Sequence, residues 1–142
     1  MAQPDIPPVN LDYAFTIRLE TSGRIAFDGP MRSRVFEPVS GGEVFGPKFN
    51  GRVVPQSGAD YASNNMMDAH LMLQASDGTW VYMNVIGYEH TVTDDGTPYF
   101  RVSPYFDTPA GPHEWLGKTV FIAHAERFHN PGYLMLHVYA LL

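Results

Sequence analysis

The stretch from Gly41 to Asp60, GGEVFGPKFNGRVVPQSGAD, decides the fold of this chain. It holds five glycines and two prolines among short runs of β-favouring residues, together with several charged side chains. Glycine and proline at this density break a helix, and glycine inside strands is typical of bends and of close contact between backbones. We therefore expect this stretch to form short, bent strands.

The residues on either side have the alternating pattern of strands. Residues 11–20 place a large apolar side chain at every second position, from Leu11 to Leu19, with mostly polar side chains between them. A period of two predicts a strand with one buried face. Comparable runs predict further strands at residues 31–37, 43–45, 49–54, 66–75, 79–89, 99–102, 119–128 and 134–142.

Two predicted turns, at residues 76–78 and 94–96, end in an Asp-Gly pair, which readily adopts the positive φ angles of a tight hairpin. The sequence shows no sustained helical period with a cap at its start, although residues 112–117 fit a short turn. Roughly eight to ten short strands at this spacing fit a sandwich or a barrel, and a closed barrel leaves no unpaired edge. We predict an all-β chain with a single closed antiparallel β-barrel over residues 11–142, preceded by a flexible N-terminal arm over residues 1–10.

Composition narrows the class of protein. The chain has 142 residues, of which 44% are hydrophobic, and this suffices for one domain with its own core. It has no cysteine, so it has no disulfide or thiolate site. The formal charge of -6 and the scattering of nine Lys and Arg residues argue against a nucleic-acid partner. The first ten residues do not resemble a signal peptide, and no run of apolar residues is long enough to cross a membrane. We therefore expect a cytoplasmic protein without a membrane partner.

Aromatic residues make up 13% of the chain, and there are seven methionines. Such side chains suit a wall that binds a hydrophobic or aromatic small molecule, and they equally suit an ordinary β-barrel core. The predicted strand at residues 134–142 reads LMLHVYALL and is apolar on both faces. Either a second subunit, as in a homodimer, or the N-terminal arm would cover its outer face.

Polar side chains on the apolar strands are the candidate chemistry. Asp68 and His70 share one face of the predicted strand at residues 66–75. They could form a proton donor and acceptor pair, or this face could simply be solvated. The next strand places Tyr82 and Asn84 on one face, where a phenol and an amide could orient a substrate oxygen. A buried tyrosine that only satisfies its own hydroxyl is the alternative.

Two further candidates lie in the later part of the chain. Arg101 could pair with Asp107 as a brace, or it could bind a substrate carboxylate, phenolate or enolate. Trp115 could be a platform for a flat ligand or a core residue. His70, His124 and His137 raise the question of a metal, but no closely spaced H-x-H pair is present and we predict no metal site. The sequence also has no phosphate-binding loop and no dinucleotide fingerprint, so we predict no cofactor.

Several short motifs occur in an order that resembles one family. They are Gly41-Gly42, Gly46-Pro47-Lys48, Asp60-Tyr61, Met67-Asp68, Asp77-Gly78, Tyr99-Phe100-Arg101, Phe106-Asp107-Thr108 and Trp115-Leu116. Over residues 11–142 this order is similar to that of a bacterial and fungal family called domain of unknown function 3237, most of whose members have no assigned activity. The resemblance implies a calycin-like or allene-oxide-cyclase-like barrel. It also leads us to expect Asp60 and Tyr61 among the substrate contacts.

Two functions follow as expectations. The first is a cofactor-independent enzyme that uses acid and base groups on an aromatic molecule in the barrel, as a cyclase, isomerase or lyase. Some fungal proteins that resemble the family are associated with secondary metabolism. One reaction there is the intramolecular addition of a phenol hydroxyl to an alkene. By this resemblance Asp68 would protonate the alkene, while His70, Tyr82 or Arg101 would stabilise the phenolate. The second is a lipocalin-like carrier of a hydrophobic or aromatic ligand that performs no chemistry.

Overall fold

The structure is a computed structural model that describes residues 3–92 and 94–142. Within these residues the chain forms ten strands and one short 3-10 helix, η1. The elements are β1 (Leu11–Thr21), β2 (Ile25–Asp28), β3 (Ser33–Phe45), β4 (Gly51–Val53), β5 (Ala59–Ser63), β6 (Met66–Ala75), β7 (Trp80–Thr91), β8 (Pro98–Asp107), η1 (Glu114–Lys118), β9 (Phe121–Phe128) and β10 (Tyr133–Leu141).

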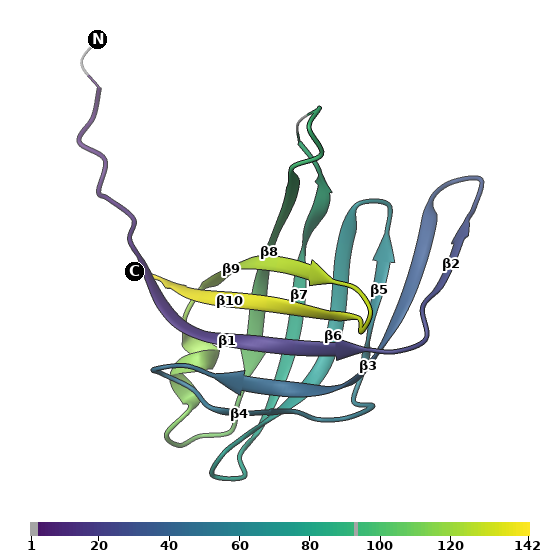
Figure 1. Ribbon diagram of the computed structural model, residues 1–142. Helices are drawn as coiled ribbons and strands as arrows, with labels where there is room; N and C mark the ends of the chain where they lie inside the picture. The colour runs from purple at the N-terminus through teal and green to yellow at the C-terminus, as the bar shows by residue number, and fades with distance from the viewer. Residues whose placement is uncertain (1–2, 93) are drawn as a thin grey trace.

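The sheet closes on itself because β1 pairs with both β10 and β3. Between these two contacts the strands follow the order β10, β9, β8, β7, β6, and β4 and β5 each pair with both β6 and β3. These pairings are antiparallel. The prediction of an all-β fold with a closed antiparallel barrel is therefore confirmed (Figure 1).

The glycine-rich stretch differs in one respect from its prediction. Strand β3 runs unbroken from Ser33 to Phe45, through two glycines at which we expected an interruption. Gly42 has φ +140°, and a Cβ atom there would lie 1.8 Å from the carbonyl oxygen of Arg18 on β1. Glycine thus lets β3 bend and still pair closely with β1. Strands β2 and β5 were not predicted, because each is short and lacks a clear alternation of apolar residues.

Strand β8 is longer than the predicted strand at residues 99–102 and continues through Pro104. Proline has no N–H group for a sheet hydrogen bond and is tolerated where a strand lacks a neighbour on one side. Strand β8 pairs with β9 only at Arg101 and Val102, so its second half is such an edge. The two predicted Asp-Gly hairpins are present between β6 and β7 and between β7 and β8.

One end of the barrel is closed by aromatic side chains. The rings of Phe15, Phe106 and Phe121 contact one another with centroids 5.3–6.2 Å apart. Phe49 packs on Phe15 at 5.4 Å, and Trp115 of η1 packs edge-on against Phe121 at 5.7 Å. Such contacts bury large apolar areas and exclude water from this end of the core.

The opposite end of the barrel is open. A cavity of about 560 Å³ lies there between the β1–β2 turn, β3, the β5–β6 hairpin, the end of β7 and the β9–β10 turn. Figure 1 shows the hairpins β2–β3, β5–β6 and β7–β8 extending beyond β9 and β10. We call this cavity the barrel mouth.

The N-terminal arm does not cover the barrel. Residues 3–10 are exposed and have no regular secondary structure, and Figure 1 shows them leading away from the sheet. Only Asn10 is tied down, through two backbone hydrogen bonds with Leu142 of 2.8 and 3.3 Å. Residues 1 and 2 of the predicted arm lie outside the described residues. Across the part of the chain that the structure describes, no helix has the length and apolar character needed to cross a membrane.

Candidate functional site

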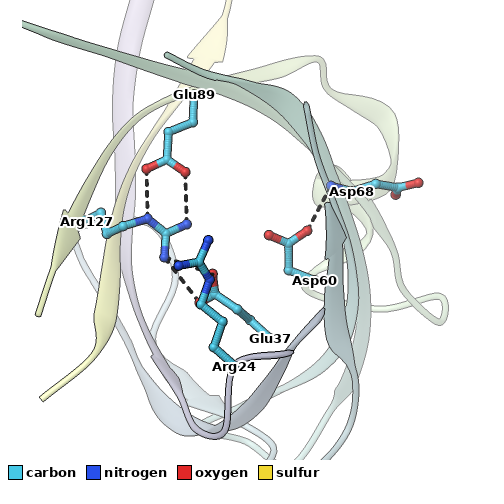
Figure 2. Close-up of polar contacts among 6 residues, drawn as sticks. All are labelled: Arg24, Glu37, Asp60, Asp68, Glu89 and Arg127. Atoms are coloured by element: carbon cyan, nitrogen blue, oxygen red, sulfur yellow. Dashed lines mark hydrogen bonds and ion pairs between the residues drawn. The ribbon is translucent and has the colours of Figure 1, made fainter. Parts of the chain in front are cut away.

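Four charged side chains point into the barrel mouth, each from a different strand. Glu37 comes from β3, Asp60 from β5, Glu89 from β7 and Arg127 from β9. Each occupies an inward position in the alternation of its strand. Figure 2 shows them converging across the mouth.

Arg127 holds two of the three carboxylates. Its Nε and Nη2 atoms donate to the two oxygens of Glu89 at 2.8 and 2.9 Å, in a bidentate pair. Its Nη1 atom donates to both oxygens of Glu37 at 3.1 and 3.2 Å. Charge-assisted bidentate pairs of this kind are among the strongest hydrogen bonds in proteins. Arg24, at the start of the β2 hairpin, adds a longer ion pair to Glu37 at 3.7 Å.

Burial and charge act against each other at Arg127. Burial alone would lower the pKa of its guanidinium, but the hydrogen bonds and charges of Glu89 and Glu37 outweigh burial and raise that pKa. The guanidinium also lies 5.8 Å above the ring centroid of Phe100, which is buried beneath it. Arg127 is therefore a fixed cation that joins β9 to β7 and β3, and most of its donors are already used.

Asp60 is the carboxyl group without a cation at hydrogen-bond distance. It is 6% exposed, and its Oδ1 atom accepts one hydrogen bond of 3.0 Å from the backbone N–H of Asp68. Directly opposite it on β3 is Glu37, so two acidic residues form a cross-strand pair. Burial, and then the negative charges of Glu37 and Glu89, raise the pKa of Asp60 from 3.8 to about 6, against the opposing effects of the Asp68 N–H and Arg127.

The mouth thus combines a protonatable acid with a rigid ion-pair network. Near neutral pH Asp60 exchanges a proton readily, which suits a general acid or base. The rest of the lining includes apolar and thioether side chains that could contact an organic ligand. These are Val35, Ala62, Met66, Met67 and Phe128.

The structure places Asp68, His70, Tyr82 and Asn84 together, but on the outer surface of the barrel. His70 Nδ1 lies 2.5 Å from the Tyr82 hydroxyl, and Asn84 Nδ2 donates to Asp68 Oδ1 at 3.2 Å. The inward side chains of these strands are apolar instead, such as Leu71. Of the two alternatives for the face that carries Asp68 and His70, the structure favours the solvated one, and Figure 2 shows the Asp68 side chain pointing away from the mouth.

Arg101 and its predicted brace also differ from expectation. Arg101 is exposed on the outer face of β8 and donates to the Phe100 carbonyl at 2.9 Å. Asp107 instead accepts a hydrogen bond of 2.8 Å from Tyr105, so the predicted pair between Arg101 and Asp107 is wrong. The two side chains share the outer face of β8, but six positions along an extended strand separate them by roughly 20 Å, which is too far for an ion pair.

Two predicted ligand contacts lie outside the mouth. Trp115 packs on the closed end of the barrel, partly buried against the core. Tyr61 follows Asp60 on β5 and therefore points outward, where its ring lies 5.2 Å from that of Phe36. Of the eight residues proposed from the sequence, Asp60 is the one whose side chain lines the mouth.

The histidines do not converge on one point. His124 and His137 are neighbours on β9 and β10, with ring centroids 6.2 Å apart, whereas His70 lies on β6. Over residues 3–92 and 94–142, no group of three or more His, Cys, Asp or Glu side chains is arranged to hold a metal ion.

Sequence reasoning missed Glu37, Glu89 and Arg127. A signal for two of them was present, because each continues an every-second-residue series of apolar side chains. Arg127 follows Phe121, Ala123 and Ala125 in this way. Glu89 ends the corresponding inward series of β7. A charged residue at the end of an apolar face indicates a position at the rim of a barrel.

The comparisons with known proteins agree with the fold. A family model described as "Protein of unknown function (DUF3237)" matches residues 8–141. A UPF0311 protein of Rhodopseudomonas palustris is 29% identical over 140 residues, covering 85% of this chain and 90% of that protein. Its crystal structure, described as a conserved protein of unknown function, superposes with a TM-score of 0.83 and covers 97% of this chain and 100% of that one.

Two more distant structures share the fold. A β-barrel-like protein of Acinetobacter baumannii has a TM-score of 0.84 at 22% identity, covering 99% of this chain and 100% of that one. A protein described as an enzyme from Penicillium herquei has a TM-score of 0.77 at 19% identity, with the same coverage. At these identities the likeness concerns the barrel alone. The family resemblance predicted from the sequence motifs is confirmed.

Proposed function

This chain belongs to the DUF3237 family, and we propose that it is a cofactor-independent enzyme that uses Asp60 to move a proton on an aromatic small molecule bound in the barrel mouth. The observation that carries the proposal is the buried Asp60 carboxyl, opposite Glu37, at the wall of a cavity of about 560 Å³, where burial raises its pKa to about 6. A carboxyl group with such a pKa can be protonated or ionised near neutral pH, as general acid–base catalysis requires.

Each of the other charged groups has a supporting role. Arg127 keeps Glu37 and Glu89 in fixed positions, and these two negative charges favour the protonated form of Asp60. The Asp68 N–H occupies one oxygen of Asp60, so the other oxygen is available to the cavity. Asp60 is the catalytic residue in this proposal, and Arg127 is a positioning residue.

A ring closure illustrates the chemistry that this site would perform. Asp60 would donate its proton to one carbon of a substrate alkene, and a phenol oxygen of the same substrate would form a bond to the other carbon. The phenol O–H bond breaks in this step, and its proton returns to the Asp60 carboxylate, so no cofactor is consumed. Orientation of the two reacting groups in one pocket contributes several kcal/mol, and proton transfer adds roughly two to four orders of magnitude in rate.

An isomerisation or a lyase step would use the same acid in the same way. The enzyme from Penicillium herquei supports the proposal in one respect only, namely that a protein with this barrel is described as an enzyme. Secondary metabolism is the setting that we propose, because aromatic substrates with internal nucleophiles are common there.

The alternative is a carrier of a hydrophobic ligand, which the open mouth and its methionine and phenylalanine lining would also allow. A carrier needs hydrogen-bond partners but gains nothing from an acid whose pKa is raised toward neutrality, since such an acid costs stability. The raised pKa of Asp60 therefore favours the enzyme over the carrier.

The test is an incubation of the protein with a metabolite extract from its source, without added cofactor, followed by mass spectrometry of bound and free compounds. We expect a compound to be converted by the wild-type protein and to be bound unchanged by Asp60→Asn. Asp68→Asn is the matched control, because its side chain points outward while its backbone N–H is retained. Compounds that bind and are recovered unchanged from the wild type would establish the carrier instead.

A further inference from the structure

A second hollow lies on the outside of the barrel, far from the chemistry of the mouth. It has a volume of about 520 Å³ and spans β1, β7, β8, β9 and β10. Its lining includes five large apolar or aromatic residues that are exposed or half-exposed to solvent, namely Leu11, Ile86, Tyr88, Ile122 and Tyr139. We call it the outer groove. Contiguous exposed apolar surface of this kind marks an interaction site.

The outer groove lies over the contact between β8 and β9. Strands β8 and β9 pair at only two positions, Arg101 with His124 and Val102 with Ala123. These four residues line the groove, so it lies over the place where the two strands are joined.

A positive charge lies in this apolar groove without an acid to balance it. Among the residues that the structure describes, Arg101 has no carboxylate within ion-pair distance, and its guanidinium contacts only the Phe100 carbonyl and, at 5.5 Å, the Tyr99 ring. The neighbouring His124 is close to Glu126, at 3.8 Å. A ligand of the groove should thus combine apolar side chains with one acid.

The N-terminal arm has this composition. Residues 4–9 read PDIPPV, and Ile6 and Val9 are 75% and 67% exposed, although both are large and apolar. Three prolines favour the polyproline II conformation, which has three residues per turn. Ile6 and Val9 then lie on the same side of the arm, and Asp5 lies beside Ile6. Proline also reduces the entropy that the arm would lose on binding.

The position of the arm indicates whose groove it occupies. Figure 1 shows the arm leading away from its own barrel, and residues 3–10 are exposed to solvent. Yet the arm joins β1 at Leu11, which is itself part of the groove lining. A second copy related by a two-fold axis near Leu11 would place each arm over the groove of the other, in an isologous exchange.

We propose that this protein forms a dimer in which the N-terminal arm of each copy lies in the outer groove of the other, with Ile6 and Val9 against its apolar lining and Asp5 near Arg101. Residues 4–10 span at most roughly 23 Å when extended, which sets the reach of the arm from Leu11. The barrel mouth opens elsewhere and stays accessible. This inference is independent of the proposed function.

Analytical ultracentrifugation over a range of concentrations tests the dimer. We expect the wild type to sediment as a dimer and Ile6→Asp/Val9→Asp to dissociate with a constant at least about tenfold weaker. Met31→Asp is the matched control, because Met31 is 86% exposed on a hairpin remote from the groove and its replacement should leave the mass unchanged. Arg101→Glu should weaken the dimer, and adding Asp5→Arg to it should restore part of the loss.

A cross-linking experiment separates exchange between copies from closure within one copy. The chain has no cysteine, so Ile6→Cys in one preparation and Ile122→Cys in another give single, defined thiols. On mixing and oxidation we expect a covalent heterodimer. A wild type that is monomeric at every concentration, a dimer that is insensitive to the arm variants, or a disulfide that forms only when both cysteines are in one chain would each overturn the proposal.

Discussion

Asp60 makes the protein less stable at neutral pH than it would be with an uncharged residue there. The folded state holds the proton of Asp60 up to about pH 6, whereas an unfolded chain releases it near 3.8. Between these values the folded state binds more protons, so stability falls as pH rises from about 4 to above 6. Below the lower value this effect is absent.

Replacing Asp60 by Asn should therefore stabilise the fold at pH 8 and have little effect at pH 4. A difference of two pKa units corresponds to an upper bound of about 3 kcal/mol at pH 8, which raises the melting temperature by several degrees in a domain of this size. Thermal melts of both proteins across this pH range measure it. Equal melting temperatures at pH 8 would contradict the raised pKa.

Arg127 should contribute to stability through the carboxylates that it neutralises. Arg127→Met leaves Glu37, whose side chain is 8% exposed, with only the distant Arg24 as a partner. Breaking a buried ion pair in this way costs about 3–5 kcal/mol, and urea unfolding of the variant should show such a loss. Adding Glu37→Gln should recover part of it, because the uncompensated charge is then removed.

The exposed Arg52, whose one hydrogen bond to another side chain among the described residues is to Gln74, supplies the control. Arg52→Met should change the free energy of unfolding by no more than about 0.5 kcal/mol. If the Arg127 variant were as stable as this control, the ion pairs of the mouth would make no net contribution to the free energy of unfolding.

Strand β5 positions Asp60, and a glycine just before the strand fixes its distance from β6. A Cβ atom on Gly58 would lie 1.7 Å from the carbonyl oxygen of His70 on β6, so alanine at this position must push the strands apart. Gly58→Ala should then destabilise the fold and move Asp60 away from the Asp68 N–H. In contrast, Gly117→Ala meets its nearest atom at 3.4 Å and should be tolerated.

Circular dichroism melts of the two glycine variants check this prediction. A Gly58→Ala protein that melts at the wild-type temperature would show that β5 can shift without cost. That outcome would also remove the argument that the glycine-rich stretch sets the geometry of the mouth.

The two faces of each strand were predictable from the sequence, but the choice of the inner face was not always clear. On β6 Asp68 and His70 share one face, as predicted, while Leu71 and Leu73 share the other. The outer face also carries Met72, so both faces contain apolar groups and hydrophobicity alone did not decide between them. Closure of the barrel decides which face points inward, because the closed interior has room for the aliphatic side chains but no water to solvate the polar ones.

The barrel as a whole separates an apolar closed end from a charged open end. The order of the strands followed from local patterns, such as the Asp-Gly hairpins, and from the family motifs. The contacts of Arg127 with Glu37 did not, because these residues are 90 positions apart and meet only after closure. Long-range ion pairs of this kind are the part of the site that a pattern along the chain does not contain.

The charge of the mouth should select its ligands. Three carboxyl groups face the partly buried Arg127 and the more exposed Arg24, in a chain with a formal charge of -6. Once Asp60 is ionised, the mouth repels anions. We expect the neutral probe 2-naphthol to bind about tenfold more tightly than 2-naphthoate at pH 8, a difference of about 1.4 kcal/mol. Calorimetry should show a smaller preference at pH 5, and tighter binding of the naphthoate at pH 8 would contradict this electrostatic picture.

The most direct measurement is a titration of the aspartate carboxyl carbons by ¹³C NMR, with Asp60→Asn used to assign the signal of Asp60. We predict one aspartate signal with a midpoint near pH 6 that is absent from the variant. A midpoint for Asp60 near the ordinary value of 3.8 would contradict the assignment of this residue as the proton donor of the barrel mouth.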